Sequence, residues 1–288
     1  MICEARSIEK SFDGKKVLDR VSFSLNKGEI VGLVGRNGSG KTTLLKILSR
    51  ILDADSGIFT VGEGDLFLEA NLIRSLAYFP DRFDYFNFTT VEKAMDYYKL
   101  IYPKFNRAFV VNEAKKNKLD LKKTIRTFSK GNTSLIGLLI VLATGADIIL
   151  CDEILDGMDV INREKIIGYL IDAKEEGRTI LLSSHELEEL SGITDRNLYL
   201  SLDGKLEDLS DKSDENIHKL QVVVKESLPE DIRSRSVIRH QIARVYTILI
   251  DIDDREIEKL MDRDEIVLYD ELEVLLEDYF YWERGKEC

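Results

Sequence analysis

One short stretch has the residue types and the spacing to hold phosphate. It reads GRNGSGKT, from Gly35 to Thr42, and matches the pattern G-x-x-x-x-G-K-[ST]. Backbone N–H groups of such a loop wrap phosphates, and the helix that follows points its positive end at them. Lys41 is placed to reach the β- and γ-phosphates, and the Thr42 hydroxyl is placed to bind Mg²⁺. The stretch therefore predicts binding of a nucleoside triphosphate.

The flanks of this loop are those that the mechanism requires. A buried strand, EIVGLVG, precedes it and an apolar helix, KTTLLKILSRIL, follows it. The alternative, a glycine turn that arose by chance, does not predict these flanks. The expected nucleotide contacts in this region are Gly35, Asn37, Gly38, Ser39, Gly40, Lys41, Thr42 and Thr43.

Two carboxylates follow a second buried strand. The segment DIILCDE puts Asp152 and Glu153 at the carboxyl end of that strand, where doubly wound sheets place their ligands. We expect Asp152 to hold Mg²⁺ through water, and Glu153 to orient or deprotonate the attacking water. The structural alternative is an ordinary acidic exit from a strand into a loop. Together with the glycine-rich loop, the pair predicts hydrolysis as well as binding.

The elements that must position these residues alternate along the chain. Buried strands at EIVGLVG, DIILCDE and RTILLSSH are separated by helical patterns such as NREKIIGYLIDAKEEG, which predicts a mostly parallel sheet. The alternating segment KVLDRVSFSLN predicts a strand near the amino terminus. Ten of the 24 aromatic residues lie between Tyr78 and Phe105 and lead into helical patterns. A mainly helical insert is therefore expected at about 82–145.

The pattern changes from about Asp203, where charged stretches alternate with short strands such as KLQVVVKE and RVYTILIDI. The closing segment DELEVLLEDYFYW predicts a helix that Asp270 caps. The residues expected on one face of that helix are Leu272, Leu275, Leu276, Tyr279 and Phe280. These elements predict a small α+β addition.

Composition excludes several classes of protein. The chain has 288 residues, is 44% hydrophobic and carries a formal net charge of -12 without a long basic run, so no nucleic acid partner is expected. Cys3, Cys151 and Cys288 are few, odd in number and far apart, which predicts neither a disulfide framework nor a zinc site and fits a reducing cytoplasm. The longest apolar run, 135–146, is too short to cross a bilayer, and no signal-peptide pattern precedes it. Membrane association is therefore expected only through a partner.

Over about residues 1–205, the order of motifs resembles the ATP-binding cassette (ABC) ATPases. In that family a serine and a glycine before a helix reach the γ-phosphate bound on another subunit, and FSKGN supplies Ser129 and Gly131. The segment DGMD resembles the family's D-loop, with Asp159 as the carboxylate that communicates across the dimer. His185 in LLSSHELEEL resembles the histidine that contacts the γ-phosphate. For Asp159 and His185, a role in capping a helix is the alternative.

Five positions resemble the family less closely or have a second interpretation. Phe12 occupies the place of an aromatic residue that stacks on adenine, or it packs in the core. Asp81 in YFPD stands where the family has glutamine and its exporter branch glutamate; it reaches a Mg²⁺-bound water, or it forms a turn with Pro80. Phe128, Lys130 and Asn132 replace the usual leucine, glycine and glutamine. Lys130 either adds a cation near the phosphate or crowds it.

The resemblance implies an α/β fold of the ABC type of P-loop NTPase. It implies a mainly parallel core sheet, antiparallel strands at the N-terminal side, the helical insert and the C-terminal α+β addition. The expected domains are 1–205, the nucleotide-binding domain, and 206–288, a small accessory domain. The implied enzyme is an ATPase that uses ATP and Mg²⁺, with Lys41, Glu153 and His185 as catalytic residues and Thr42, Asp81 and Asp152 at the metal.

The resemblance also implies partners and a location. A separate integral-membrane subunit is expected, with candidate contacts at Phe83, Tyr85, Phe86 and Phe88, although these aromatics are equally suited to the insert's own core. The FSKG variant resembles bacterial drug and peptide-antibiotic exporters, so export is the expected direction. The ATPase is expected to pair with itself or with a paralogue, in the cytoplasm, on the inner face of the cell membrane. The alternatives are a soluble ABC ATPase with a regulatory or assembly role, and a degenerate subunit that binds ATP without turnover.

Overall fold

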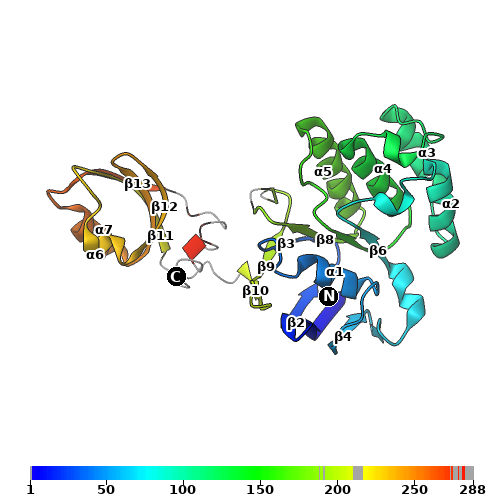
Figure 1. The fold of residues 1–288 in the computed structure, drawn as a ribbon, viewed down its shortest axis with the longest axis horizontal. Helices are drawn as coiled ribbons and strands as arrows, with labels where there is room; N and C mark the ends of the chain where they lie inside the picture. Colours follow the sequence, from blue (N-terminus) through cyan, green and yellow to red (C-terminus); the bar gives the residue numbers. More distant parts are fainter. Residues whose placement is uncertain are drawn as a thin grey trace. The chain divides into compact units, whose positions relative to one another are not determined.

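The computed structural model describes residues 2–187, 189–190, 192–209, 217–272, 274, 278 and 281–282. The chain divides into two compact units, Met1–Asp208 and Leu209–Cys288, each of which is described by itself (Figure 1). Within the described residues, no helix combines the length and the apolar character needed to span a membrane. Cys3 and Cys151 are buried and free, and burial raises the pKa of the Cys3 thiol to about 12.

A six-stranded sheet forms the centre of the first unit, in the order β10-β9-β3-β8-β7-β6. The strands from β9 to β6 pair in parallel, and β10 pairs antiparallel with β9. Their bounds are β3 Ile30–Val34, β6 Leu76–Phe79, β7 Ile148–Cys151, β8 Thr179–Ser184, β9 Arg196–Leu200 and β10 Leu206–Asp208. The predicted mainly parallel core is confirmed. Strand β10 pairs with β9, and the first compact unit ends with it at Asp208.

A second, antiparallel sheet, ordered β2-β1-β4-β5, lies at the N-terminal side. Its strands are β1 Cys3–Phe12, β2 Lys15–Leu25, β4 Ser56–Val61 and β5 Gly64–Asp65. Together with helix α1 (Lys41–Leu48) it covers one face of the central sheet. The prediction of antiparallel strands in this part of the chain is confirmed.

Helices cover the opposite face of the central sheet, where Figure 1 shows α4 and α5 in green on the side away from α1. The helices are α2 Val91–Ile101, α3 Arg107–Lys116, α4 Lys130–Leu142 and α5 Val160–Glu175, with short 3-10 helices η2 Asp84–Phe86 and η3 Ile125–Thr127. A further 3-10 helix, η1 Ala70–Ser75, packs on the α1 side instead. The predicted helical insert at about 82–145 contains α2, α3 and α4.

Strand β7 shows why the central strands are continuous apolar runs. Ile149 and Cys151 face the core beneath α4 and α5, whereas Ile148 and Leu150 face the core beneath α1 and the antiparallel sheet. A strand that is buried on both faces has no polar side to alternate with. The Asp-Glu pair follows at the first position where the chain leaves this buried strand.

A single glycine lets α4 approach β6. A Cβ atom on Gly137 would lie 2.5 Å from Cε2 of Phe79 and 2.9 Å from Cδ2 of Phe83, which leaves no room for a side chain. The close packing of α4 on the end of β6 therefore depends on Gly137. This contact fixes the distance between the first turn of α4, which carries Ser129, and the end of β6, which leads to Asp81.

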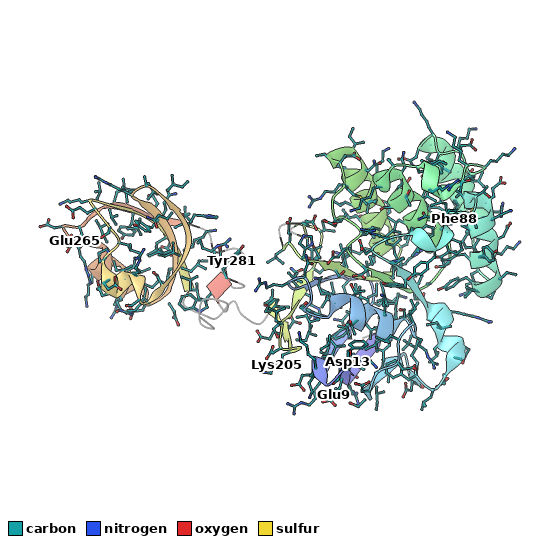
Figure 2. All side chains as sticks on the ribbon, viewed as in Figure 1. Glu9, Asp13, Phe88, Lys205, Glu265 and Tyr281 are labelled. Carbon is teal, nitrogen blue, oxygen red and sulfur yellow. The ribbon has the colours of Figure 1, made fainter. Side chains whose placement is uncertain are left out.

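The four aromatic residues predicted as partner contacts divide into two groups. Phe83 is 3% exposed and its ring stacks on Phe79, while Phe86 packs against Phe83 and Tyr98. Tyr85 and Phe88 are 72% and 84% exposed, and Phe88 is labelled at the surface of the helical region in Figure 2. Of the two predicted alternatives, Phe83 therefore follows the core one, because its ring fills the space beside Gly137.

The second unit is built on an antiparallel sheet in the order β12-β13-β11-β14. Its elements are β11 Ile217–Val224, α6 Glu230–Arg233, β12 Ser236–Ile242, β13 Val245–Asp251, α7 Asp254–Met261 and β14 Ile266–Leu272. Ile232 of α6 and Ile257 of α7 pack on one face of the sheet, and Trp282 packs with Leu249 in a smaller cluster. The predicted small α+β addition is confirmed.

The closing helix is predicted wrongly at its start. Asp270 and Leu272 lie in strand β14, where they pair with Gln221 and Lys219 of β11. Ladder bonds to a central strand outweigh the local helical pattern. Four predicted residues of that helix face, Leu275, Leu276, Tyr279 and Phe280, lie outside the described residues.

Candidate nucleotide site

A cavity of about 400 Å³ lies over the glycine-rich loop. It is lined by Phe12, Val17, Asn37, Gly38, Gly40, Lys41, Thr42, Thr43, Asp81 and Glu153. The structure thus brings the loop, the Asp81 position and Glu153 together, and Val17 is the lining residue that the sequence does not predict. Phe12 is partly exposed at this cavity, with the Lys10 ammonium 5.4 Å from the centre of its ring, so it is not a core residue.

The loop has the backbone shape that its glycines permit. Gly40 has φ +107°, in the left-handed region, and a Cβ atom there would lie 3.0 Å from Val17. At Gly35 a Cβ atom would lie 2.5 Å from the carbonyl oxygen of Leu200, so β9 passes directly against the loop. The Ser39 hydroxyl is buried and has no hydrogen-bond partner among the described residues.

Lys41 is the charged centre of the loop. Its side chain is 4% exposed, and its Nζ donates to the carbonyl oxygen of Gly35 at 2.7 Å and lies 3.3 Å from Oε1 of Glu153. A buried ammonium needs a charged partner, and Glu153 provides it. The anionic oxygens of a triphosphate compete with Glu153 for this ammonium, because both need the same donor.

Glu153 is held in a conformation that few residues adopt. Its φ is +46°, in the left-handed region, which costs on the order of 1–3 kcal/mol for a residue with a side chain. Its backbone N–H donates to the Ser183 hydroxyl at 3.0 Å. Ser183 lies on β8, beside β7, so the sheet itself supports the strained turn.

Asp152 is fully buried and each of its oxygens has a donor. The Ser183 hydroxyl donates to Oδ1 at 2.8 Å, and the Tyr78 hydroxyl donates to Oδ2 at 3.2 Å. Burial, together with the Asp152 carboxylate, raises the pKa of Tyr78, so this hydroxyl stays protonated and remains a donor. Sequence reasoning missed Ser183 and Tyr78. Their signal was a polar side chain near the carboxyl end of each strand that flanks β7.

His185 lies beside Glu153 but is not among the cavity-lining residues. Its Nδ1 is 3.9 Å from Oε2 of Glu153, and its Nε2 is 3.7 Å from Oε1 of Glu186. Both distances exceed those of a hydrogen bond. The ring is thus close to Glu153 without being bonded to it, at the end of strand β8.

The remaining predicted residues form a second group that does not line the cavity. The Ser129 hydroxyl caps α4 by accepting from the N–H of Asn132 at 3.4 Å. Asp159 caps α5 and accepts from both the backbone and the side chain of Asn162, bonds that lower the pKa of its carboxyl. A Cβ atom on Gly131 would lie 2.5 Å from Nδ2 of Asn162. Asn162, which sequence reasoning also missed, therefore joins Gly131 to Asp159.

A buried strand, a glycine-rich loop, a helix and a buried Asp-Glu pair on a parallel sheet define a P-loop nucleotide-hydrolysing domain. Comparison with known proteins narrows this class. The family model described as "ABC transporter" matches residues 18–156. The ABC transporter ATP-binding protein YtrB of Bacillus subtilis is 30% identical over 286 residues, 98% of each chain. The chain therefore belongs to the ABC transporter family and is an ATP-binding subunit that hydrolyses ATP to power transport.

Other similarities agree with the fold. The xylose/arabinose import ATP-binding protein XylG of Sulfolobus acidocaldarius is 28% identical, over 77% of this chain and 93% of XylG. The solved structure of the ADP conformation of MJ1267, an ATP-binding cassette of an ABC transporter, is similar with a TM-score of 0.61 and 22% identity, over 72% of this chain and 89% of that one. ATP-binding subunits of this family work with separate membrane subunits.

We predict that Ser183→Ala lowers kcat for ATP hydrolysis about 10-fold to 100-fold, because Asp152 and Glu153 both lose the hydroxyl that positions them. The matched control is Thr179→Val at the other end of β8, where the hydroxyl also makes two hydrogen bonds, to Gly28 and Asn26, far along the strand from the carboxylates. Steady-state hydrolysis and thermal unfolding are measured for both variants. Equal losses of kcat in the two variants would show that Ser183 acts only through stability.

Proposed function

We propose that two copies of this cassette close head to tail around two ATP molecules and that this closure drives export through a separate membrane subunit. The observation that carries the proposal is that the predicted nucleotide contacts form two separate groups in one chain, which we assign to the two halves of a composite site. One half is the loop with Lys41 and Glu153, which share a cavity; the other is the Ser129–Gly131 turn, which stands apart from that cavity.

In the first half, each residue has a role that its position supports. Lys41 binds the β- and γ-phosphates, and Phe12 stacks on the adenine at the edge of the cavity. The Thr42 hydroxyl, the Asp152 carboxylate and Asp81 would hold Mg²⁺ directly or through water, since oxygen ligands suit this ion. When bound, Mg²⁺ neutralises charge on the phosphates.

Glu153 orients and deprotonates the attacking water, and His185 contacts the γ-phosphate. The Lys41 ammonium leaves Glu153 for the phosphates when ATP enters, because the phosphate oxygens carry more negative charge than one carboxylate. Glu153 is then free to accept a proton from water. Its backbone stays fixed by Ser183, so the release of Lys41 changes the side chain and not the loop.

In the second half, Ser129 and Gly131 bind the γ-phosphate of the partner's ATP. The hydroxyl of Ser129 and the free N–H groups at the start of α4 form an anion-binding end of a 13-residue helix. Gly131 lacks a side chain because Asn162 packs against it, and Asn162 holds Asp159, the residue proposed to communicate across the dimer.

The membrane partner is proposed to contact the helical insert in the cytoplasm, on the inner face of the cell membrane. Phe88 and Tyr85 are the most exposed aromatic residues described in this insert, and the Arg126 guanidinium lies 5.3 Å from the centre of the Phe88 ring. The sequence FSKG at Phe128–Gly131, which resembles that of bacterial exporters, supports export as the direction of transport. XylG, which is 28% identical to this chain, is named for import. The proposed direction therefore rests on the FSKG sequence. No described residue and no comparison favours the alternative of a non-transport ABC ATPase.

We predict that Glu153→Gln makes the chain dimerise in Mg-ATP, because ATP stays bound when the general base is lost and the Glu153–Lys41 ion pair no longer competes with phosphate. Size exclusion with light scattering measures the mass. Ser129→Arg in the same background is expected to abolish the dimer by filling the γ-phosphate contact. A Glu153→Gln chain that stays monomeric while it binds ATP would exclude the homodimer and would point to a paralogue as the second cassette.

We predict that a photo-crosslinking amino acid at Phe88 captures a multispanning membrane protein from cells, whereas the same probe at Leu100 does not. Leu100, on α2, is 81% exposed, close to the 84% of Phe88, so exposure is matched. Washed membranes are analysed by mass spectrometry after irradiation. Capture of soluble proteins alone from position 88 would contradict the proposed interface.

A further inference from the structure

Lys130, the residue that replaces a family glycine, makes one ion pair in the structure. It is the first residue of α4, and its Nζ lies 3.2 Å from Oδ2 of Asp156. Its Nζ also lies only 2.9 Å from where a Cβ atom on Gly157 would be, and Gly157 has φ +60°. Gly157 thus gives the lysine room to cross the loop. The start of α4 is therefore tied to the loop that follows Glu153.

Asp156, the acidic partner in this ion pair, lies in a turn that begins at Glu153, the proposed general base. The backbone N–H of Asp156 donates to the carbonyl oxygen of Glu153 at 3.1 Å, so Asp156 closes a turn that begins at Glu153. Glu153 has the strained φ of +46° described above. A shift of Asp156 is transmitted to Glu153 by this short turn and not by a flexible segment.

The charges around Lys130 favour its contact with Asp156. Lys130 also borders a cavity of about 350 Å³, together with Asp81, Arg82, Phe83, Asn87, Arg126, Phe128, Thr133 and Ser134. Two of these residues, Arg82 and Arg126, are cations that repel the ammonium from that cavity. Asp81 is the acidic residue on the same wall, but the ion pair that Lys130 makes is with Asp156.

We propose that Lys130 is a positioning residue that couples the two ATP sites through its ion pair with Asp156. Ser129 senses ATP on the partner chain, Lys130 passes the position of α4 to Asp156, and the turn to Glu153 sets the general base for the chain's own ATP. Asn162, six residues after Asp156, packs against Gly131, the residue next to Lys130. This contact is a second link between the start of α4 and the segment that follows Glu153. This inference rests on the proposed head-to-tail dimer.

The pair suits a role that appears only in the closed dimer. The side chains of Lys130 and Asp156 are 52% and 39% exposed, so in one chain water screens their attraction and the pair contributes little to folding stability. A second cassette that covers the Ser129 turn removes this water and strengthens the attraction. The Lys130–Asp156 ion pair therefore couples the two ATP sites only when the dimer is closed. Loss of this ion pair leaves the single chain folded.

The test compares four variants: Lys130→Met, Asp156→Asn, the double variant and Lys130→Arg. The control is Lys116→Met, because Lys116 forms another surface ion pair, with Glu113 on α3. Steady-state hydrolysis at varied ATP gives kcat, KM and the Hill coefficient. We expect each single loss of charge to lower kcat roughly 10-fold to 100-fold and to bring the Hill coefficient from near 2 to about 1. The double variant falls no further than either single variant, and Lys130→Arg keeps most of the activity.

Two kinetic results would overturn the proposal. One is unchanged kcat and Hill coefficient in the single variants; the other is a double variant whose loss is the product of the single losses, since independent residues behave that way. The variants are also made in the Glu153→Gln background, where all are expected to form the Mg-ATP dimer. If the parent Glu153→Gln chain forms none, the proposed dimer fails; if the parent dimerises but the single variants do not, Lys130 is a dimer contact and the coupling role fails.

Discussion

The parallel register of β3, β8 and β7 is the constraint on which the rest of the site depends. Val34 is opposite Ser184, and Cys151 is opposite Leu182, so the three strands end at nearly the same level of the sheet. The chain beyond each end must therefore enter one shared space. The glycine-rich loop, the Asp152-Glu153 turn and His185 are the three segments that enter it. A slip of one residue in this register would turn alternate side chains to the other face of the sheet.

Charge within this space is balanced by the protein itself. Lys41 is paired with Glu153, and Asp152 receives two hydroxyl donors, so neither buried charge is without a partner. Ser183 has a double function, because the same hydroxyl donates to Asp152 and accepts from the Glu153 N–H. The strained backbone of Glu153 is thus supported by the carboxylate beside it. The positions of both carboxylate residues therefore depend on the one hydroxyl of Ser183.

The sequence predicted the parts of the fold whose signals are local. The loop at Gly35–Thr42, the strand before Asp152 and the helical insert follow from spacing and apolar patterns, and the structure has each of them where it was expected. The helix predicted to begin at Asp270 fails because pairing with β11 is a contact between distant segments, which no local pattern encodes. Phe83 was indistinguishable in sequence from Phe88. Phe83 is a core residue because its ring fills the space beside Gly137, whereas Phe88 is exposed.

The functional site is likewise predictable from sequence only where its signals are local. Lys41 and Glu153 were found because a motif marks each of them, whereas Ser183, Tyr78 and Asn162 act on those motifs from other strands and helices. Their side chains are of common types, and their roles depend on which strands are neighbours. Asp156 was part of a recognised segment, DGMD, but its partner Lys130 lies 26 residues earlier. Such a pair becomes visible only when α4 is packed against the loop before α5.

The central claim is that each ATP site is shared between two chains. The most direct measurement mixes two variants, both with Glu153→Gln: one chain carries Lys41→Ala and keeps its Ser129 turn, and the other carries Ser129→Arg and keeps its loop. Radiolabelled ATP bound per particle is measured by gel filtration with light scattering. The account predicts that each chain alone forms no dimer and that the mixture forms dimers that retain one ATP each. A mixture that forms no dimer, or a dimer that retains two ATP molecules, would contradict it.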